Sequence, residues 1–216
     1  MMSKQKLSQD EIDKIVVAER VVALPTVCGV GFNDVAFQNR IGKRQIWQYR
    51  LWVNLLSRCF CDKFKAKHPA YQDVTCCDEW LSFVTFLEWL NKEVGYSGRP
   101  NGSDLDKDIV IKGNKAYSPE TCSFVPQAVN KLLTDSGATR REWPVGVRFH
   151  ENTGSFHARM SCNSKSKHLG SYKTPEEAFA VYKIAKEAQI KVVAMQHKDV
   201  LKPTVYEALM NWKVEE

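Results

Sequence analysis

Residues 145–178, VGVRFHENTGSFHARMSCNSKSKHLGSYKTPEEA, contain the strongest structural pattern in the chain. Three short runs that suit strands are separated by two polar segments rich in turn-forming residues, 152–154 and 163–166. Thr174, Pro175 and Glu177 then have the spacing of a helix start with a capping box. We therefore predict a three-stranded antiparallel sheet packed on one helix, with strands at 145–150, 155–161 and 167–172 and a helix from 175 to about 195.

Basic side chains alternate along these expected strands. Residues two apart in a strand point to the same face, so Arg148 shares a face with His150, and His157 shares a face with Arg159. We expect these side chains and Lys167 to lie together on one face of the sheet, while the helix covers the other face. Such a face can lie in the major groove of DNA, where arginine makes paired hydrogen bonds to guanine.

The rest of the chain reads mainly as helices. Apolar periodicity predicts helices at 8–22, 46–60, 80–94 and 203–213, and 26–37 suits a short strand or loop. Between 105 and 133 the expected order is strand, turn, strand and short helix, with strands at 105–111 and 116–124. We predict an α+β fold with a domain at 1–134, a linker at 135–142 and a domain at 143–216.

The positive charge is concentrated. The 216 residues carry a formal net charge of +6, which suggests a polyanionic partner only weakly. Residues 40–67 hold eight basic residues and one acidic residue, interleaved with aromatic side chains, a composition that suits contacts with DNA phosphates and bases. Arg44, Arg50 and Arg58 are the candidates in this stretch. The alternative is a solvated helix face whose aromatic residues belong to the core.

The cysteines indicate a reducing compartment. There are seven, an odd number, and no secretion signal precedes them, so reduced thiols in a cytoplasm are the simplest interpretation. Neither the C-x-C at Cys59 nor the adjacent pair Cys76-Cys77 has the spacing of a zinc knuckle, so we expect no zinc. No apolar run is long enough to cross a membrane, and we expect that the protein does not bind to a membrane.

Residues 146–185 resemble the DNA-binding domain of plant-type APETALA2/ethylene-response factors. The matching residues are Gly146-Val147-Arg148, Gly154–Arg159, Leu169–Tyr172, Thr174–Ala178, Ala180, Tyr182 and Ala185. The resemblance covers the whole sheet-plus-helix unit and implies that the strands contact double-stranded DNA in the major groove. Phe156 stands where the family usually has tryptophan, so one contact expected of the family is altered.

Most of residues 26–133 resemble phage-encoded HNH homing endonucleases, many of which carry such a C-terminal domain. The matching pieces are Thr26–Asp34, Trp52–Phe60, Val74–Trp80 with Phe83, Phe86 and Trp89, Leu105–Ile109, Gly113–Lys115, Tyr117–Cys122, Phe124–Pro126 and Asn130. The resemblance implies that 105–133 forms a ββα nuclease core around one divalent metal, Mg2+ or another cation, without an organic cofactor. It also implies a phage-encoded protein that acts in the cytoplasm of a bacterial host.

The chain departs from the family pattern at the expected base. Asp106 and Asn130 match metal ligands, but Lys107 replaces the usual histidine, and Thr121 replaces the middle asparagine. Lys107 can act as a base only if burial or the cation lowers its pKa by several units. Asp108 is a second candidate, and loss of a proton from metal-bound water to solvent is a third possibility. Alternatively, residues 106–108 are a charged strand end with structural hydrogen bonds.

These observations lead to three hypotheses. The first is a site-specific, metal-dependent DNA endonuclease or nickase that acts as a monomer on DNA and cuts one strand at a time. The second is a catalytically degenerate relative that binds a DNA site as a regulator or competitor. The third is an interaction protein whose basic surface meets an acidic protein, which predicts weak affinity for DNA.

Overall fold

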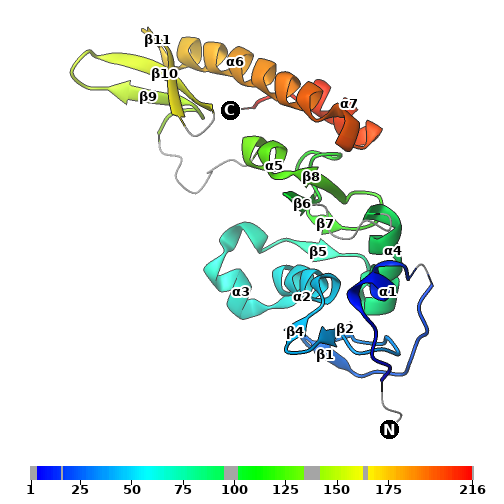
Figure 1. Cartoon of the computed structure of the whole chain (residues 1–216). Helices are drawn as coiled ribbons and strands as arrows, with labels where there is room; N and C mark the ends of the chain where they lie inside the picture. The colour runs from blue at the N-terminus through cyan, green and yellow to red at the C-terminus, as the bar shows by residue number, and fades with distance from the viewer. Residues whose placement is uncertain (1–3, 16, 95–101, 134–141, 163–164, 216) are drawn as a thin grey trace. The chain divides into compact units, whose positions relative to one another are not determined.

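A computed structural model of the chain describes residues 4–15, 17–94, 102–133, 142–162 and 165–215 (Figure 1). The described part is mixed α+β, with seven α-helices and several small sheets, which confirms the α+β class. The chain divides into two compact units, residues 1–124 and 125–216, and the division falls within strand β8. The expected linker at 135–142 lies, apart from Glu142, outside the described residues.

The first unit combines helices with short two-stranded sheets. β1 pairs with β2 and β3 with β4 in antiparallel fashion, β5 pairs with β7 in parallel, and β6 pairs with β8. Its elements are α1 (Gln9–Asp13), β1 (Pro25–Val27), β2 (Gly31–Phe32), β3 (Arg40–Ile41), β4 (Arg44–Gln45), α2 (Trp47–Phe60), α3 (Asp62–Lys67), β5 (Thr75–Cys76), α4 (Phe83–Val94), β6 (Ser103–Asp106), β7 (Ala116–Tyr117), β8 (Ser123–Pro126) and 3-10 helices at Pro69–Tyr71 and Asp78–Leu81.

The core of this unit lies between α2 and α4. Trp52 of α2 is fully buried, and its indole Nε1 donates a hydrogen bond of 2.7 Å to the backbone oxygen of Trp80. Phe83 and Phe86 at the start of α4 are also fully buried and pack against these tryptophans. The apolar stripes of both helices therefore face one another, as their periodicity predicts. The six cysteines whose side chains are described are free thiols.

Several expected elements have different bounds. The capping box of Ser8 and Glu11 is present, but α1 ends at Asp13, so the predicted helix at 8–22 is wrong beyond that point. The chain then runs extended: Arg20 bridges to Val35, and the backbone N–H of Val21 donates to Asp34. Pairing with a distant segment satisfies backbone groups that a longer helix would have satisfied internally. The predicted strand at 105–111 is also wrong, because β6 ends at Asp106 in a turn.

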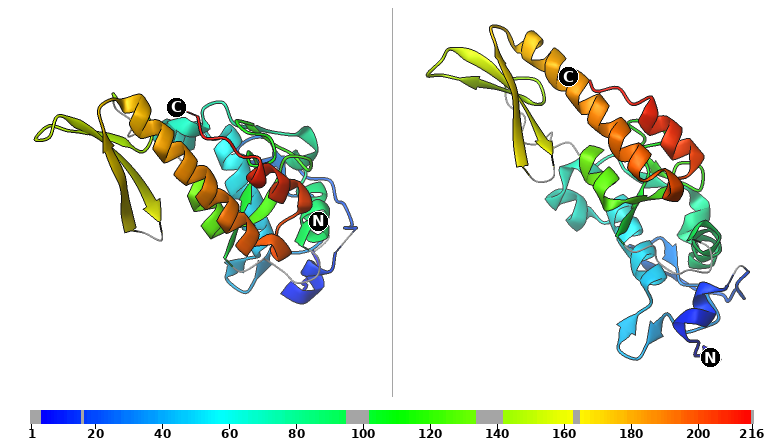
Figure 2. Two further views of the ribbon diagram at one scale, coloured as in Figure 1. Left: turned by 90° about the horizontal axis from the view of Figure 1, so that it is seen from above. Right: turned by 45° about the horizontal axis from the view of Figure 1, so that its top comes forward.

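The second unit is built on the three-stranded sheet that the sequence predicts. β9 (Val147–His150), β10 (Ser155–Cys162) and β11 (Lys165–Tyr172) are antiparallel in the order β11-β10-β9. One long helix, α6 (Pro175–Gln196), packs against all three strands, and α5 (Gln127–Leu133) and α7 (Pro203–Met210) pack against α6 (Figure 2). A 3-10 helix, Lys198–Val200, joins α6 to α7.

The packing of α6 on the sheet depends on a close approach at Gly146. This residue precedes β9 and has a φ of +78°, a conformation that favours glycine. A Cβ atom there would collide with the ring of Tyr182, which α6 buries against the sheet. The N-terminus of α6 carries the expected capping box, in which Thr174 and Glu177 satisfy each other's backbone N–H groups. The helix α6 thus covers one face of the sheet, and the opposite face is the one on which binding residues can lie.

Candidate nucleic-acid interface and carboxylate centre

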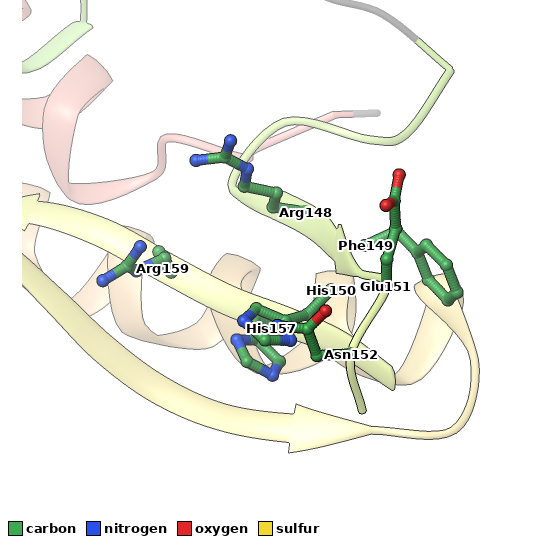
Figure 3. A pocket seen from close by; sticks show the side chains of 7 residues that line it. All are labelled: Arg148, Phe149, His150, Glu151, Asn152, His157 and Arg159. Carbon is green, nitrogen blue, oxygen red and sulfur yellow. The ribbon is translucent and has the colours of Figure 1, made fainter. Parts of the chain in front are cut away.

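The face of the sheet opposite α6 carries arginine and histidine side chains (Figure 3). In the pairing of β9 with β10, Arg148 lies opposite His157, and directly paired residues point to the same face. In the pairing of β10 with β11, Arg159 lies opposite His168. The neighbouring residues Ala158 and Met160 are buried and point to the α6 side. The alternation therefore places Arg148, His157 and Arg159 together on the exposed face, as predicted.

Three histidines form a row across this face. The rings of His150 and His157 are stacked, with centroids 4.7 Å apart and planes 11° from parallel. The rings of His157 and His168 meet edge to face at 5.1 Å. Partial burial, together with His150, His168 and Arg159 nearby, lowers the pKa of His157. The row therefore concentrates three titratable groups beside two permanent cations.

A β-bulge determines which residue of β11 reaches this face. The register of β10 against β11 shifts between Ala158, which pairs with Gly170, and Arg159, which pairs with His168. Leu169 is therefore an extra residue that the register pairs with no residue of β10. Beyond the bulge, Lys167 pairs with Met160, which places it on the same side as that buried residue. The predicted position of Lys167 beside the arginines is therefore wrong, and His168 takes that place.

His168 was missed because simple alternation ignores bulges. The signal that points to it is Gly170, an isolated glycine inside a strand, which is typical of a bulge. Gly170 has a φ of +147°, and a Cβ atom there would collide with the side chain of Tyr172. The backbone at this point is therefore one that only glycine adopts readily.

The arginine and histidine side chains of β9 and β10 border a cavity of about 480 Å³ on the exposed face of the sheet. Its lining includes Arg148, His150, His157, Arg159 and one acidic residue, Glu151 (Figure 3). Four of these five side chains are basic, so the cavity is suited to an anionic group rather than an apolar one.

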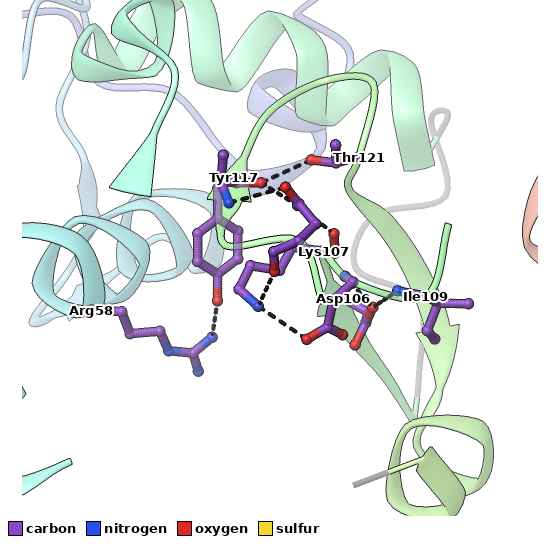
Figure 4. Close-up of polar contacts among 9 residues, drawn as sticks. Arg58, Asp106, Lys107, Ile109, Tyr117 and Thr121 are labelled. Carbon is purple, nitrogen blue, oxygen red and sulfur yellow. Dashed lines mark hydrogen bonds and ion pairs between the residues drawn. The ribbon is translucent and has the colours of Figure 1, made fainter. Parts of the chain in front are cut away.

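A second site lies at the end of β6, where two carboxyl groups meet (Figure 4). The carboxylate of Asp106 accepts hydrogen bonds of 2.9 Å from the backbone N–H groups of Asp108 and Ile109. Burial, and then the charge of Asp108, raise the pKa of Asp106 to about 6. This is the position predicted to hold a metal, and it is electrostatically suited to a cation.

Lys107, the residue in the expected position of the base, is engaged as a hydrogen-bond donor. Its Nζ lies 3.1 Å from the Oδ2 of Asp108 and donates at 3.1 Å to the backbone oxygen of Asn114. The ammonium also lies 5.7 Å from the centre of the Tyr117 ring. The Lys107 side chain is 11% exposed, whereas that of Asp108 is 47% exposed. Asp108 is therefore the more accessible of the two predicted catalytic groups.

Two other residues, Thr121 and Asn130, occupy positions of the ββα pattern that the HNH resemblance implies. The hydroxyl of Thr121, which replaces an asparagine of the family pattern, donates to the backbone oxygen of Ala116 at 3.0 Å. Asn130 lies on α5 in the second unit and is half-buried. Among the described residues, no group of three or more His, Cys, Asp or Glu side chains is arranged to hold a metal ion. A metal here would depend on the Asp106–Asp108 pair and on ligands of other types.

The three arginines predicted in the basic stretch differ in their surroundings. Arg44 on β4 and Arg50 on α2 are exposed. Arg58 is half-buried on α2; its Nη1 donates to the hydroxyl of Tyr117 at 3.1 Å, and its guanidinium lies 5.5 Å from the Tyr71 ring centre. Within the described ranges, no carboxylate forms an ion pair with Arg58. A partly buried cation without a carboxylate partner is suited to bind an anion such as a phosphate.

None of the known protein-family models, curated protein sequences or solved structures matches this chain. No helix in the described ranges combines the length and apolar character needed to traverse a lipid bilayer. The assignment of a function to this chain therefore depends on its own residues and their geometry.

Proposed function

We propose that this chain is a DNA endonuclease or nickase of the HNH type that binds double-stranded DNA through its C-terminal sheet. The observation that carries the enzymatic part is the Asp106 carboxyl group, which is partly buried near a second carboxyl group at the end of β6. Burial, and then the charge of Asp108, raise the pKa of Asp106, and perturbed carboxyl groups of this kind are typical of catalytic or metal sites.

The residues at this centre fit a magnesium ion. Carboxylate oxygens are the ligands that Mg2+ prefers, and a divalent cation would remove the repulsion that raises the pKa of Asp106. Asp106 would hold the ion, and Asn130, the other ligand that the HNH resemblance implies, belongs to the second unit. When bound, the ion would stabilise the negative charge that develops on the phosphate and on the leaving oxygen.

The remaining chemistry is assigned to the side chains around Asp106. Asp108 is half-exposed and acts as the base that accepts a proton from the attacking water. Lys107 holds Asp108 by its hydrogen bond of 3.1 Å. Arg58, which donates a hydrogen bond to Tyr117, would hold a DNA phosphate. Arg148, His150, His157 and Arg159 bind the duplex from the sheet.

A second function is favoured by the hydrogen bonds of Lys107. Because two acceptors already engage this ammonium group, it is poorly suited to replace the histidine base of the family pattern. If Asp108 cannot replace that base either, the chain is a DNA-binding protein that regulates or competes for a site without cutting it.

A plasmid-relaxation assay separates these functions. Supercoiled DNA that carries the native locus is incubated with wild type, Asp106→Asn or Asn130→Ala, with Mg2+ or with a chelator. Asp73→Asn, which changes an exposed carboxylate of the first unit, is the matched control. We expect nicked circles from wild type and Asp73→Asn only with Mg2+, and none from the other two variants. Salt-sensitive binding without relaxation would refute the enzymatic function and support the second one.

A further inference from the structure

Three of the five histidines in the chain lie in one row on the exposed face of the C-terminal sheet. His157 is the centre of the row, and its ring contacts the rings of both His150 and His168. Each strand of the sheet supplies one member, so the row exists only when all three strands are paired. Histidine is the side chain whose ordinary pKa, about 6.5, lies nearest to physiological pH.

The groups that surround the row are mostly cationic. Arg148 lies opposite His157 in the sheet, and Arg159 lies opposite His168. Glu151 is the acidic residue in the lining of the adjoining cavity. The hydroxyl of Thr153 contacts the ring of His150, and the hydroxyl of Ser171 contacts that of His168. The helix α6 packs on the opposite face, so its charged side chains do not face the row.

We infer that the His150–His157–His168 row takes up protons when the sheet binds DNA, so that DNA binding is coupled to pH. This inference rests on the DNA-binding part of the proposed function. In the free protein, burial and the nearby His150, His168 and Arg159 lower the pKa of His157 and so oppose its protonation. A DNA phosphate brings negative charge to the same face and favours the protonated imidazoles, each of which then donates two hydrogen bonds.

The size of the effect follows from the linkage between protonation and binding. If DNA raises the pKa of one histidine by about one unit from about 6.5, its affinity increases about fivefold between pH 7.5 and pH 5.5. Three such histidines acting together would increase the affinity for DNA by up to about a hundredfold. Repulsion between the three protonated imidazoles reduces this increase. We therefore expect an increase of at least about tenfold over this pH range.

The inference is tested by fluorescence anisotropy with a labelled duplex at constant ionic strength between about pH 5.5 and about pH 7.5. The test variant is the triple change His150→Gln, His157→Gln, His168→Gln. The matched control is His68→Gln with His197→Gln, because these two histidines lie outside the sheet. Circular dichroism and thermal melting establish that the variants are folded, and calorimetry in buffers of different ionisation enthalpy measures the protons taken up.

We expect wild type and the control variant to bind more tightly at low pH with uptake of protons, and the triple variant to bind with little dependence on pH. DNA binding that is independent of pH, or a triple variant with the pH dependence of wild type, would overturn the inference while leaving the proposed DNA binding intact. If a single change, His168→Gln in a folded protein, does not reduce the uptake of protons, the row does not act as proposed. Absence of DNA binding at every pH would refute the DNA-binding function itself.

Discussion

The partly buried carboxyl group of Asp106 gives the most quantitative test of the carboxylate centre. Its pKa is raised from an ordinary value of 3.8 to about 6. The folded protein therefore binds a proton more tightly than the unfolded chain, and this contribution to stability is present below pH 3.8 and lost as the pH rises through about 6. A shift of about two units corresponds to about 3 kcal/mol of destabilisation above that pH.

The substitution Asp106→Asn removes the charge but keeps an oxygen that can accept from the N–H groups of Asp108 and Ile109. We expect this variant to be more stable than wild type by about 1 to 3 kcal/mol near pH 7.5 and to differ little near about pH 3.5, below the ordinary pKa of the carboxyl group. Urea denaturation in a chelator, followed by tryptophan fluorescence, measures the difference, because four of the six tryptophans lie in the first unit. Asp73→Asn again serves as the control.

Addition of Mg2+ extends the same experiment. A cation that binds the folded state at Asp106 should stabilise wild type with increasing concentration and leave Asp106→Asn unchanged. A variant that is less stable than wild type near neutral pH would refute the electrostatic reasoning, because it would mean that the ionised carboxylate stabilises the fold. Equal stabilisation of both proteins by Mg2+ would refute the assignment of the ion to this residue.

Other predictions concern the scaffold and the basic stretch. Gly146→Ala should destabilise the second unit by about 2 to 4 kcal/mol, since the new Cβ meets Tyr182 in a backbone conformation that disfavours alanine; thermal melting of Trp143 fluorescence measures this. Thr174→Ala removes the helix cap of α6 and should cost about 1 kcal/mol in the same assay, whereas no change would show that the cap is dispensable. Arg58→Met should reduce the slope of log affinity for DNA against log salt by about one, and an unchanged slope would exclude a phosphate contact there.

The second unit was the more predictable part of the fold, because its signals are local. The alternation of β9 and β10, the turn at 152–154 and the capping box before α6 each act over a few residues, and each is present in the structure. The bounds of α2 were predicted to within one residue, since its apolar stripe packs on one neighbouring helix. In these segments local preference and tertiary packing agree.

The errors in the prediction arise where distant segments decide the structure. Residues beyond Asp13 leave the helical conformation because they pair with residues near Val35, and nothing in residues 8–22 indicates that partner. The environment of Arg58 depends on Tyr117, which is 59 positions away in sequence. The position of Lys167 depends on a bulge that shifts the strand register. A prediction from simple side-chain alternation assumes a regular register and does not include such a shift.

The same bulge affects how the exposed basic face of the sheet can change in evolution. If Leu169 paired with Arg159 in a regular register, without the bulge, the pairing would shift by one position and every residue from Ser166 to His168 would exchange faces. A substitution alters one side chain of this surface, whereas one residue inserted between His168 and Gly170 shifts the register and replaces His168 on this face by Lys167 in a single step. Libraries of short insertions in β11 are therefore a more direct route to an altered basic face than libraries of point mutations.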